Sequence, residues 1–173
     1  MKTTLNDAWL WNKLTLQEKN EACLEALASD EVAPNLIFML ASVLNFRPNA
    51  LMKKPREDLA SKLASHMMVK KLRDGIEPVL RLWLVKSRGT LITDFLEAAG
   101  IPHDGAFIKD DAPELTAAQV AQGMEAVLKT HPASDLDLYL GYVLVFGDPI
   151  YWSALHAMAE EGHPLLKSFS VEA

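Results

Sequence analysis

Apolar residues recur every three or four positions along most of this chain, and this helical spacing constrains the fold more than any other feature. In the segment 55–73, for example, Leu59, Leu63 and Met67 share one face of a helix. An apolar stripe of this kind is stable only when another element covers it. We therefore predict an all-α fold, a single compact bundle of seven to eight helices with two or three central apolar helices.

Capping residues, prolines and glycines place the helix ends. Thr15 and Glu18 have the spacing of a capping box, in which the hydroxyl accepts a hydrogen bond from a free N–H and the carboxylate reaches back. Pro34 fits the first turn of a helix, and Gly100 fits the left-handed position that closes one. The expected helices are 15–29, 35–46, 55–73, 79–86, 90–99, 116–130, 135–146 and 149–161.

Three of these helices are apolar on most sides, and we expect them to be the central ones: 35–46, 79–86 and 135–146. Trp83 and Leu80, in the middle one, are expected to be buried. The third segment is rich enough in Tyr, Val and Phe to suit a buried β-strand instead. We favour a helix there because no second strand candidate could pair with it.

The length and composition fit one domain, residues 1–173. Half of the residues are apolar, which is enough for a substantial core. Residues 103–114 contain an Asp-Gly pair, two adjacent aspartates and a proline, and we expect them to form the main loop and the one candidate seam between sub-bundles. The single cysteine, Cys23, excludes an internal disulfide and is expected to be a core residue.

The sequence also gives expectations about cellular location. The first residues show no signal-peptide pattern, and the longest apolar stretch, 138–146, is about half the length that a membrane-spanning helix needs. We therefore expect a cytoplasmic protein without membrane contact.

The charges are strongly segregated along the chain. Residues 1–46 carry a net charge of −3, residues 47–88 carry +7, and residues 89–173 carry −10. A basic centre attracts polyanions, whereas an acidic C-terminal half repels them. The pattern therefore favours packing of the basic segment against the acidic one, either within a chain or across a homodimer.

The basic segment makes nucleic-acid binding an alternative function, because each phosphate that a lysine or arginine neutralises releases counterions. Against this reading, the segment lacks the interleaved aromatic residues on which single-strand binders stack bases. The candidate phosphate-contacting residues are Lys53, Lys54, Arg56, Lys70, Lys71 and Arg73.

A second candidate site lies on the expected last helix, where Trp152, His156 and Glu160 are spaced four residues apart. We expect this row to face outward, opposite the apolar arc of the helix, and we assign these three as candidate partner-binding residues. The five histidines include no H-E-x-x-H pair, and we expect neither a metal site nor a cofactor.

No short motif in the sequence indicates a catalytic chemistry. It has no G-x-S-x-G, no G-x-x-x-x-G-K-[ST] and no G-x-G-x-x-G, and no spacing nominates a general acid and base. We therefore expect a non-catalytic helical interaction or adaptor protein that acts through protein–protein contacts, with a homodimer as one arrangement. The alternatives are nucleic-acid binding through residues 47–88, and an enzyme or small-ligand binder with a pocket between helices.

Overall fold

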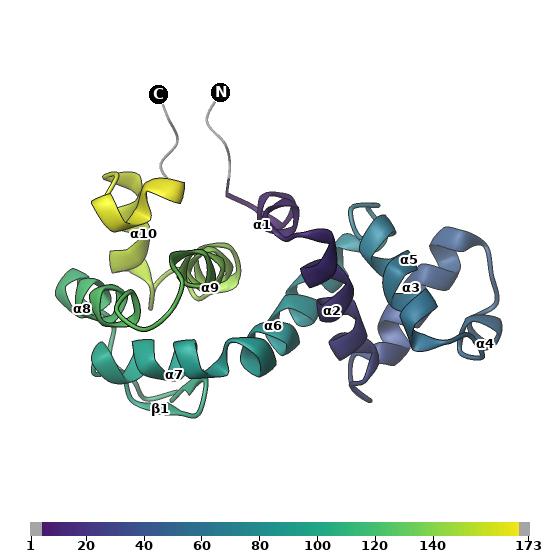
Figure 1. Cartoon of the computed structure of the whole chain (residues 1–173), viewed down its shortest axis with the longest axis horizontal. Coiled ribbons are helices and arrows are strands. Elements are labelled where there is room, and N and C mark those ends of the chain that lie inside the picture. Colours follow the sequence, from purple (N-terminus) through teal and green to yellow (C-terminus); the bar gives the residue numbers. More distant parts are fainter. Residues whose placement is uncertain (1–4, 170–173) are drawn as a thin grey trace. The chain divides into compact units, whose positions relative to one another are not determined.

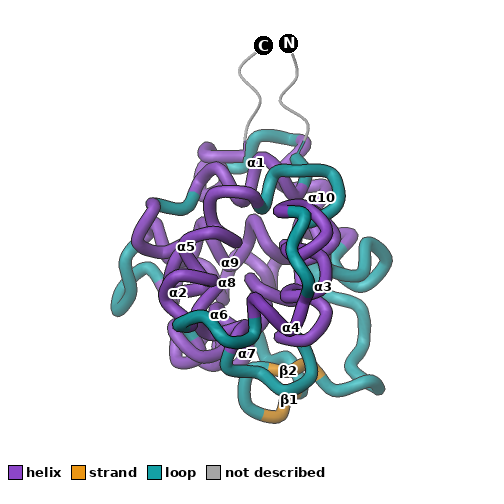
Figure 2. Tube along the Cα trace, turned by 90° about the vertical axis from the view of Figure 1, so that its right-hand side faces the viewer, coloured by secondary structure: helices purple, strands orange, loops and turns teal. Residues whose placement is uncertain are grey.

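The computed structural model describes residues 5–169, and almost all of the described trace is helix, loop and turn (Figure 2). Its only β-structure in that range is one two-stranded hairpin, so the all-α class is confirmed. The described residues contain ten α-helices. This exceeds the expected number because two short helices, α1 (Asp7–Lys13) and α4 (Pro48–Leu51), lie outside the expected segments. Among the helices described, none has the length and apolar character needed to span a membrane.

The chain divides into two compact units. The N-terminal unit consists of residues 7–84, and the C-terminal unit consists of residues 85–169 together with the described residues 5 and 6. The boundary falls inside one helix, α6 (Ile76–Ser87). The loop 103–114, which the sequence nominates as a seam, lies within the C-terminal unit. A single domain of residues 1–173 stays a prediction.

In the N-terminal unit, α2 packs against α5, and α3 packs against both of them (Figure 1). Their facing stripes form the core of this unit, as amphipathic helices require. The core side chains include Trp11, Cys23, Leu27, Leu36, Leu40, Leu59, Leu63, Met67, Leu72 and Leu80. The elements are α1, α2 (Leu16–Leu27), α3 (Ala33–Leu44), α4, α5 (Arg56–His66), the 3-10 turn η1 (Arg73–Gly75) and most of α6.

The start of α2 confirms the predicted capping box. Glu18 N donates to Thr15 Oγ1 at 3.2 Å, and Thr15 N donates to Glu18 Oε2 at 2.8 Å. Cys23 is buried on the inner face, as expected. Leu16, by contrast, is 70% exposed. It lies in the first turn of α2, whereas the buried residues of this helix begin at Ala22.

Residues 35–46 were expected to form a central helix that its neighbours cover on most sides, and this prediction is wrong. In α3, Leu36 and Leu40 face the core, whereas Phe38 on the opposite side is 64% exposed. The neighbouring helices cover one face of α3 and leave the other open. The helix ends at Asn45, which has a left-handed φ of 54° and lets Phe46 N donate to the carbonyl of the last helical turn.

α5 is shorter than the expected helix 55–73. Leu63 and Met67 are buried, which confirms the predicted inward face. Over residues 66–75, three successive turns, each closed by a backbone hydrogen bond from residue i+3 to residue i, replace the last turns of the expected helix. These turns leave Met68 exposed, although a helix continued to residue 73 would have placed it beside the inward face. In α6, by contrast, Trp83 and Leu80 are buried as predicted.

In the C-terminal unit, α7 packs against α8 and α9, and α10 packs against α8 (Figure 1). Phe95 of α7 lies in this core, with ring-centroid distances of 5.6 Å to Tyr139 and 6.3 Å to Trp152. Gly123 permits the close approach of α8, because a Cβ there would lie 2.8 Å from the Phe95 ring. The elements are α7 (Gly89–Ala98), β1 (His103–Asp104), β2 (Phe107–Ile108), α8 (Ala117–Val127), α9 (Ala133–Phe146), α10 (Ser153–Glu160) and the 3-10 segment η2 (Pro164–Phe169).

Two expectations about this unit have clear outcomes. Residues 135–146 lie in α9, so the helix is confirmed over the strand. The segment 103–114 is not irregular throughout, because it opens with the antiparallel hairpin of β1 and β2, in which His103 pairs with Ile108 and Asp104 pairs with Phe107. The remainder of that segment is loop.

Candidate interaction surfaces

Large apolar side chains are exposed on the N-terminal unit, and they lie among basic residues. Exposed single apolar residues are ordinary on proteins, whereas a gathering of them marks an interaction site. Phe46, Met52, Met68 and Val69 lie within two residues of a lysine or arginine along the chain, and Phe38 lies one helical turn from Ser42, which accepts a hydrogen bond from Lys71. They fall into two groups, around α3 and around α4.

The first group, which we call the α3 patch, consists of Phe38, Ser42, Met68, Val69 and Lys71. Lys71 Nζ donates to Ser42 Oγ at 3.2 Å, which places the segment 66–72 beside the open face of α3. Phe38 lies one helical turn before Ser42 on that same face. The patch therefore combines an aromatic ring with aliphatic side chains and an ammonium group.

Close packing beneath the α3 patch holds the segment 66–75 against α3. A Cβ added to Gly75 would lie 2.7 Å from Leu36 Cδ2 and 3.3 Å from Met39 Cε. A side chain at this position would have to displace the ends of the Leu36 and Met39 side chains. The α3 patch thus lies on two segments that are fixed to each other.

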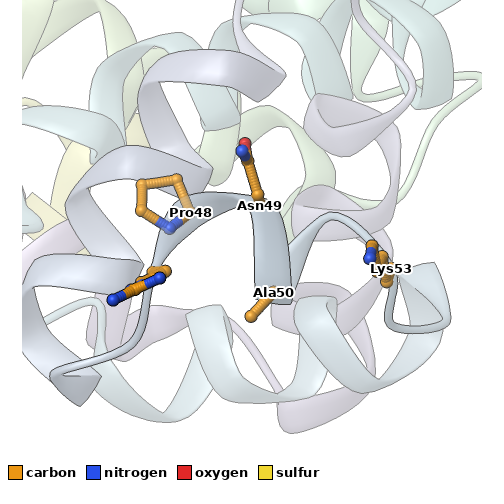
Figure 3. Close-up of a pocket in the computed structure, with 5 residues that line it drawn as sticks. Pro48, Asn49, Ala50 and Lys53 are labelled. Carbon is orange, nitrogen blue, oxygen red and sulfur yellow. The ribbon is translucent and has the colours of Figure 1, made fainter.

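The second group, which we call the α4 patch, consists of Phe46, Arg47, Met52 and Lys53. Between them lies an open hollow of about 560 Å³ lined by Arg47, Pro48, Asn49, Ala50 and Lys53. In Figure 3, Pro48 begins the short helix, Asn49 and Ala50 lie within it, and Lys53 lies on the segment that follows it. Phe46 and Met52 border these lining residues in the chain and are 51% and 63% exposed. The α4 patch therefore offers apolar contact area together with two cationic groups.

The candidate phosphate-contacting residues differ in how far they are engaged within the protein. Lys53, Lys54, Arg56, Lys70 and Lys71 are exposed. Arg73 instead forms an ion pair with Asp7, with Arg73 Nε donating to Asp7 Oδ2 at 3.0 Å. The side-chain hydrogen bond from Arg73 lowers the pKa of Asp7, and the same bond raises the pKa of Arg73. Arg73 therefore ties α1 to η1 and is less available to an outside phosphate than the exposed residues are.

The candidate row on the last helix is not an exposed row. Glu160 is exposed, His156 is half-buried, and Trp152 is only 4% exposed. The prediction that Trp152 faces outward is wrong. Trp152 occupies the N-cap position of α10, where the backbone departs from the helix, and its ring turns into the core toward Phe95. The helical wheel that placed it outside does not apply at that position.

The surroundings of Trp152 include two buried polar atoms, Tyr151 Oη and His156 Nε2, that have no hydrogen-bond partner among the described residues. Tyr151 packs edge-on against Trp152 at 5.5 Å between ring centroids. Burial raises the pKa of both Tyr151 and Tyr139, so these phenols stay protonated at neutral pH. These aromatic residues form the interior of the C-terminal unit rather than a partner surface.

The hairpin of the C-terminal unit carries an exposed aromatic ring beside acidic residues. Phe107 is 57% exposed, and its cross-strand partner Asp104 is exposed as well. Directly opposite residues of an antiparallel pair project on the same face of the hairpin. Gly105 takes a φ of 57° in the tight turn, where a side chain would be strained. The exposed acidic residues that follow in the loop are Asp110, Asp111 and Glu114.

Ionisable groups elsewhere do not assemble a metal centre in the part of the chain that the structure describes, where no group of three His, Cys, Asp or Glu residues could hold an ion. His131 Nε2 lies 2.7 Å from Asp94 Oδ2, and Arg88 Nε lies 3.0 Å from Asp135 Oδ1. Both contacts join segments within the C-terminal unit. Burial raises the pKa of the Cys23 thiol to about 12, which makes it unreactive in the folded unit.

The exposed Phe38 has a sequence signal that helical periodicity alone does not reveal. Asn35 lies one turn before Phe38, and Ser42 lies one turn after it. The polar residues of this apolar helix thus share the face that carries Phe38. Phe107 has no comparable signal, since its exposure follows from a hairpin of only two residues per strand.

Comparisons with known proteins do not identify a relative of this chain. No protein-family model matches it, and searches of curated proteins and of solved structures give no match. The chain is therefore described by its fold class, an all-α protein of two compact helical units, and its function is argued from its surfaces.

Proposed function

We propose that this chain is a non-catalytic interaction protein whose N-terminal unit binds another protein through the α3 patch and the α4 patch. The observation that carries the proposal is the exposure of Phe38, Phe46 and Met52 among lysine and arginine side chains. Exposed aromatic and methionine side chains are typical anchors of protein interfaces, because their burial supplies much of the binding energy.

The combination of basic and apolar residues in the two patches indicates the surface chemistry of the partner. Basic residues at the rim steer an acidic partner toward the patch and increase the association rate, whereas apolar residues slow dissociation. A partner with an acidic, partly apolar surface fits this arrangement best.

The proposal can be tested by quantitative affinity capture from the native host with matched variants. Phe38→Ser removes the aromatic anchor of the α3 patch. Leu16→Ser is the control, because Leu16 is at least as exposed on the same unit but lies in neither patch. We expect at least one protein that wild type and Leu16→Ser capture equally and that Phe38→Ser loses. Failure to find any such protein, with all three chains folded by circular dichroism, would contradict this function.

Nucleic-acid binding is the second candidate, and one feature favours it. Phe46 is exposed and directly precedes Arg47, the first residue of the basic segment. An exposed aromatic ring therefore borders this segment, although the segment itself lacks interleaved aromatic residues. Exposed rings beside basic residues are the combination on which single-stranded nucleic acids stack. An enzyme or a small-ligand binder stays a sequence-based prediction.

Fluorescence anisotropy with a labelled single-stranded oligonucleotide separates the two candidates. If the basic segment binds nucleic acid, affinity falls steeply with salt, and Lys53→Ala reduces the slope of log K against log salt by about 1. Phe46→Ala should then weaken binding by about 1–3 kcal/mol. An unchanged anisotropy at low salt excludes this candidate and leaves the protein-binding proposal standing.

A further inference from the structure

We propose that the α4 patch binds the acidic hairpin of a second copy of this chain, so that two copies pair through reciprocal contacts. This inference rests on the proposed function, because it names the occupant of one of the two patches. It uses two surfaces whose chemistry is described above and needs no other component.

The receiving surface is recessed and cationic. Arg47 and Lys53 line the hollow at α4, and no carboxylate is among its five lining residues. The exposed Phe46 and Met52 border it in the chain. An occupant that combines a carboxylate with an aromatic ring would satisfy both the charges and the apolar area.

The hairpin offers that combination on one face. The register pairs Asp104 directly with Phe107, so the carboxylate and the ring project side by side. His103 Nδ1 lies 2.8 Å from the Gly105 carbonyl oxygen, and Lys109 N donates to the Pro102 carbonyl oxygen at 3.0 Å. The first contact fixes the turn and the second closes the ends of the hairpin, so little conformational freedom is lost when it binds.

The local charges of these two surfaces are opposite, although each whole chain carries a net charge of −6. Residues 85–173 carry a net charge of −8, because only five basic residues oppose thirteen carboxylates. The basic residues around α4, Arg47, Lys53 and Lys54, are exposed to solvent. Opposite potentials on two surfaces steer their association and disfavour pairing of like with like.

A second copy is the occupant that closes the arrangement. Each chain carries one α4 patch and one hairpin, so an exchange of hairpins between two copies makes two equivalent contacts. When both contacts form between the same two copies, they are related by a two-fold axis and the assembly ends at the dimer. The sequence-based expectation of a homodimer thereby acquires a specific interface.

Charge reversal and mixing test the proposal. Lys53→Glu in one chain and Asp104→Lys in another each place like charges together when either variant pairs with itself. In an equimolar mixture, both contacts of the mixed dimer have opposite charges again. By sedimentation equilibrium at low salt, we expect the dimer dissociation constant to rise about tenfold or more for each variant alone. It should return toward the wild-type value only in the mixture.

The controls are charge changes of the same sign outside both surfaces, Lys129→Glu and Asp30→Lys, which should leave dimerisation unchanged alone and when mixed. Phe107→Ala should weaken the dimer, whereas Ile150→Ala, a change at an apolar residue of the same unit that is at least as exposed, should not. A wild-type chain that is monomeric at every salt and concentration overturns the proposal. So does a dimer that withstands both charge reversals, or a mixture that fails to restore association.

These results are separable from the test of the proposed function. If self-association fails but Phe38→Ser still loses a captured protein that Leu16→Ser keeps, the hairpin inference is wrong and the interaction function stands. If both tests fail, both proposals are wrong.

Discussion

At the scale of single residues, burial decides which aromatic side chains stabilise the fold and which are available for binding. Trp83 is 3% exposed, whereas Phe38 projects from α3 into solvent. We expect Trp83→Ala to lower the free energy of unfolding by about 3–5 kcal/mol, because it removes a large buried ring and leaves a cavity. Phe38→Ala should change it by no more than about 0.5 kcal/mol. Urea denaturation followed by far-ultraviolet circular dichroism measures both, and a similar loss in the two variants would contradict this division.

The ion pair between Asp7 and Arg73 predicts a pH effect that also belongs to this scale. The hydrogen bond from Arg73 lowers the pKa of Asp7 in the folded unit below its ordinary value of 3.8. The pair therefore stabilises the fold above about pH 4, and that stabilisation is lost as pH falls through the lowered pKa. Asp7→Asn should destabilise the protein at neutral pH, and the difference from wild type should shrink in strong acid. Asp30→Asn, an exposed carboxylate change, serves as the control in the same denaturation series.

At the scale of elements, the two capping boxes make α2 and α8 begin where they do. Thr15 pairs with Glu18, and Thr116 pairs with Gln119 in the same pattern. Because each hydroxyl accepts from an otherwise free backbone N–H, Thr15→Ala and Thr116→Ala should each cost about 1 kcal/mol. Thermal unfolding of the two variants checks this. Replacement by serine, which keeps the hydroxyl, should recover most of the loss, and a serine variant as unstable as alanine would argue against capping.

Features that depend on nearby residues could be predicted from the sequence, and features that depend on distant ones could not. The capping box at Thr15 and the burial of Trp83 follow from local spacing and apolar pattern. The exposure of Phe38 depends on which face of α3 its neighbours leave open, and the inward turn of Trp152 depends on where α10 begins. Helix type and approximate ends therefore follow from the sequence, while the candidate surfaces required the fold.

At the scale of the whole molecule, the two units share α6, and their boundary lies inside that helix. Because one continuous helix crosses the boundary, unfolding of either unit would break helical hydrogen bonds at the end of the other, so we expect the units to unfold in one cooperative transition. In Trp152→Phe, the remaining tryptophans all lie in the N-terminal unit, so its urea titration followed by tryptophan fluorescence should coincide with the titration followed by far-ultraviolet circular dichroism, which reports the helices of both units. Two separate midpoints would show that the single domain 1–173 predicted from the sequence is in fact two.

Because the chain's one cysteine is buried, its rate of chemical labelling measures how often the N-terminal unit opens. Cys23 lies on the inner face of α2 with no exposed surface, and its raised pKa keeps it a thiol at ordinary pH. A thiol reagent can therefore reach it only during moments when α2 separates from its neighbours. Where reclosing is faster than modification, the labelling rate reports the free energy of that opening. Thiol labelling of the wild-type chain thus measures local opening of the N-terminal unit alone, because the C-terminal unit has no cysteine.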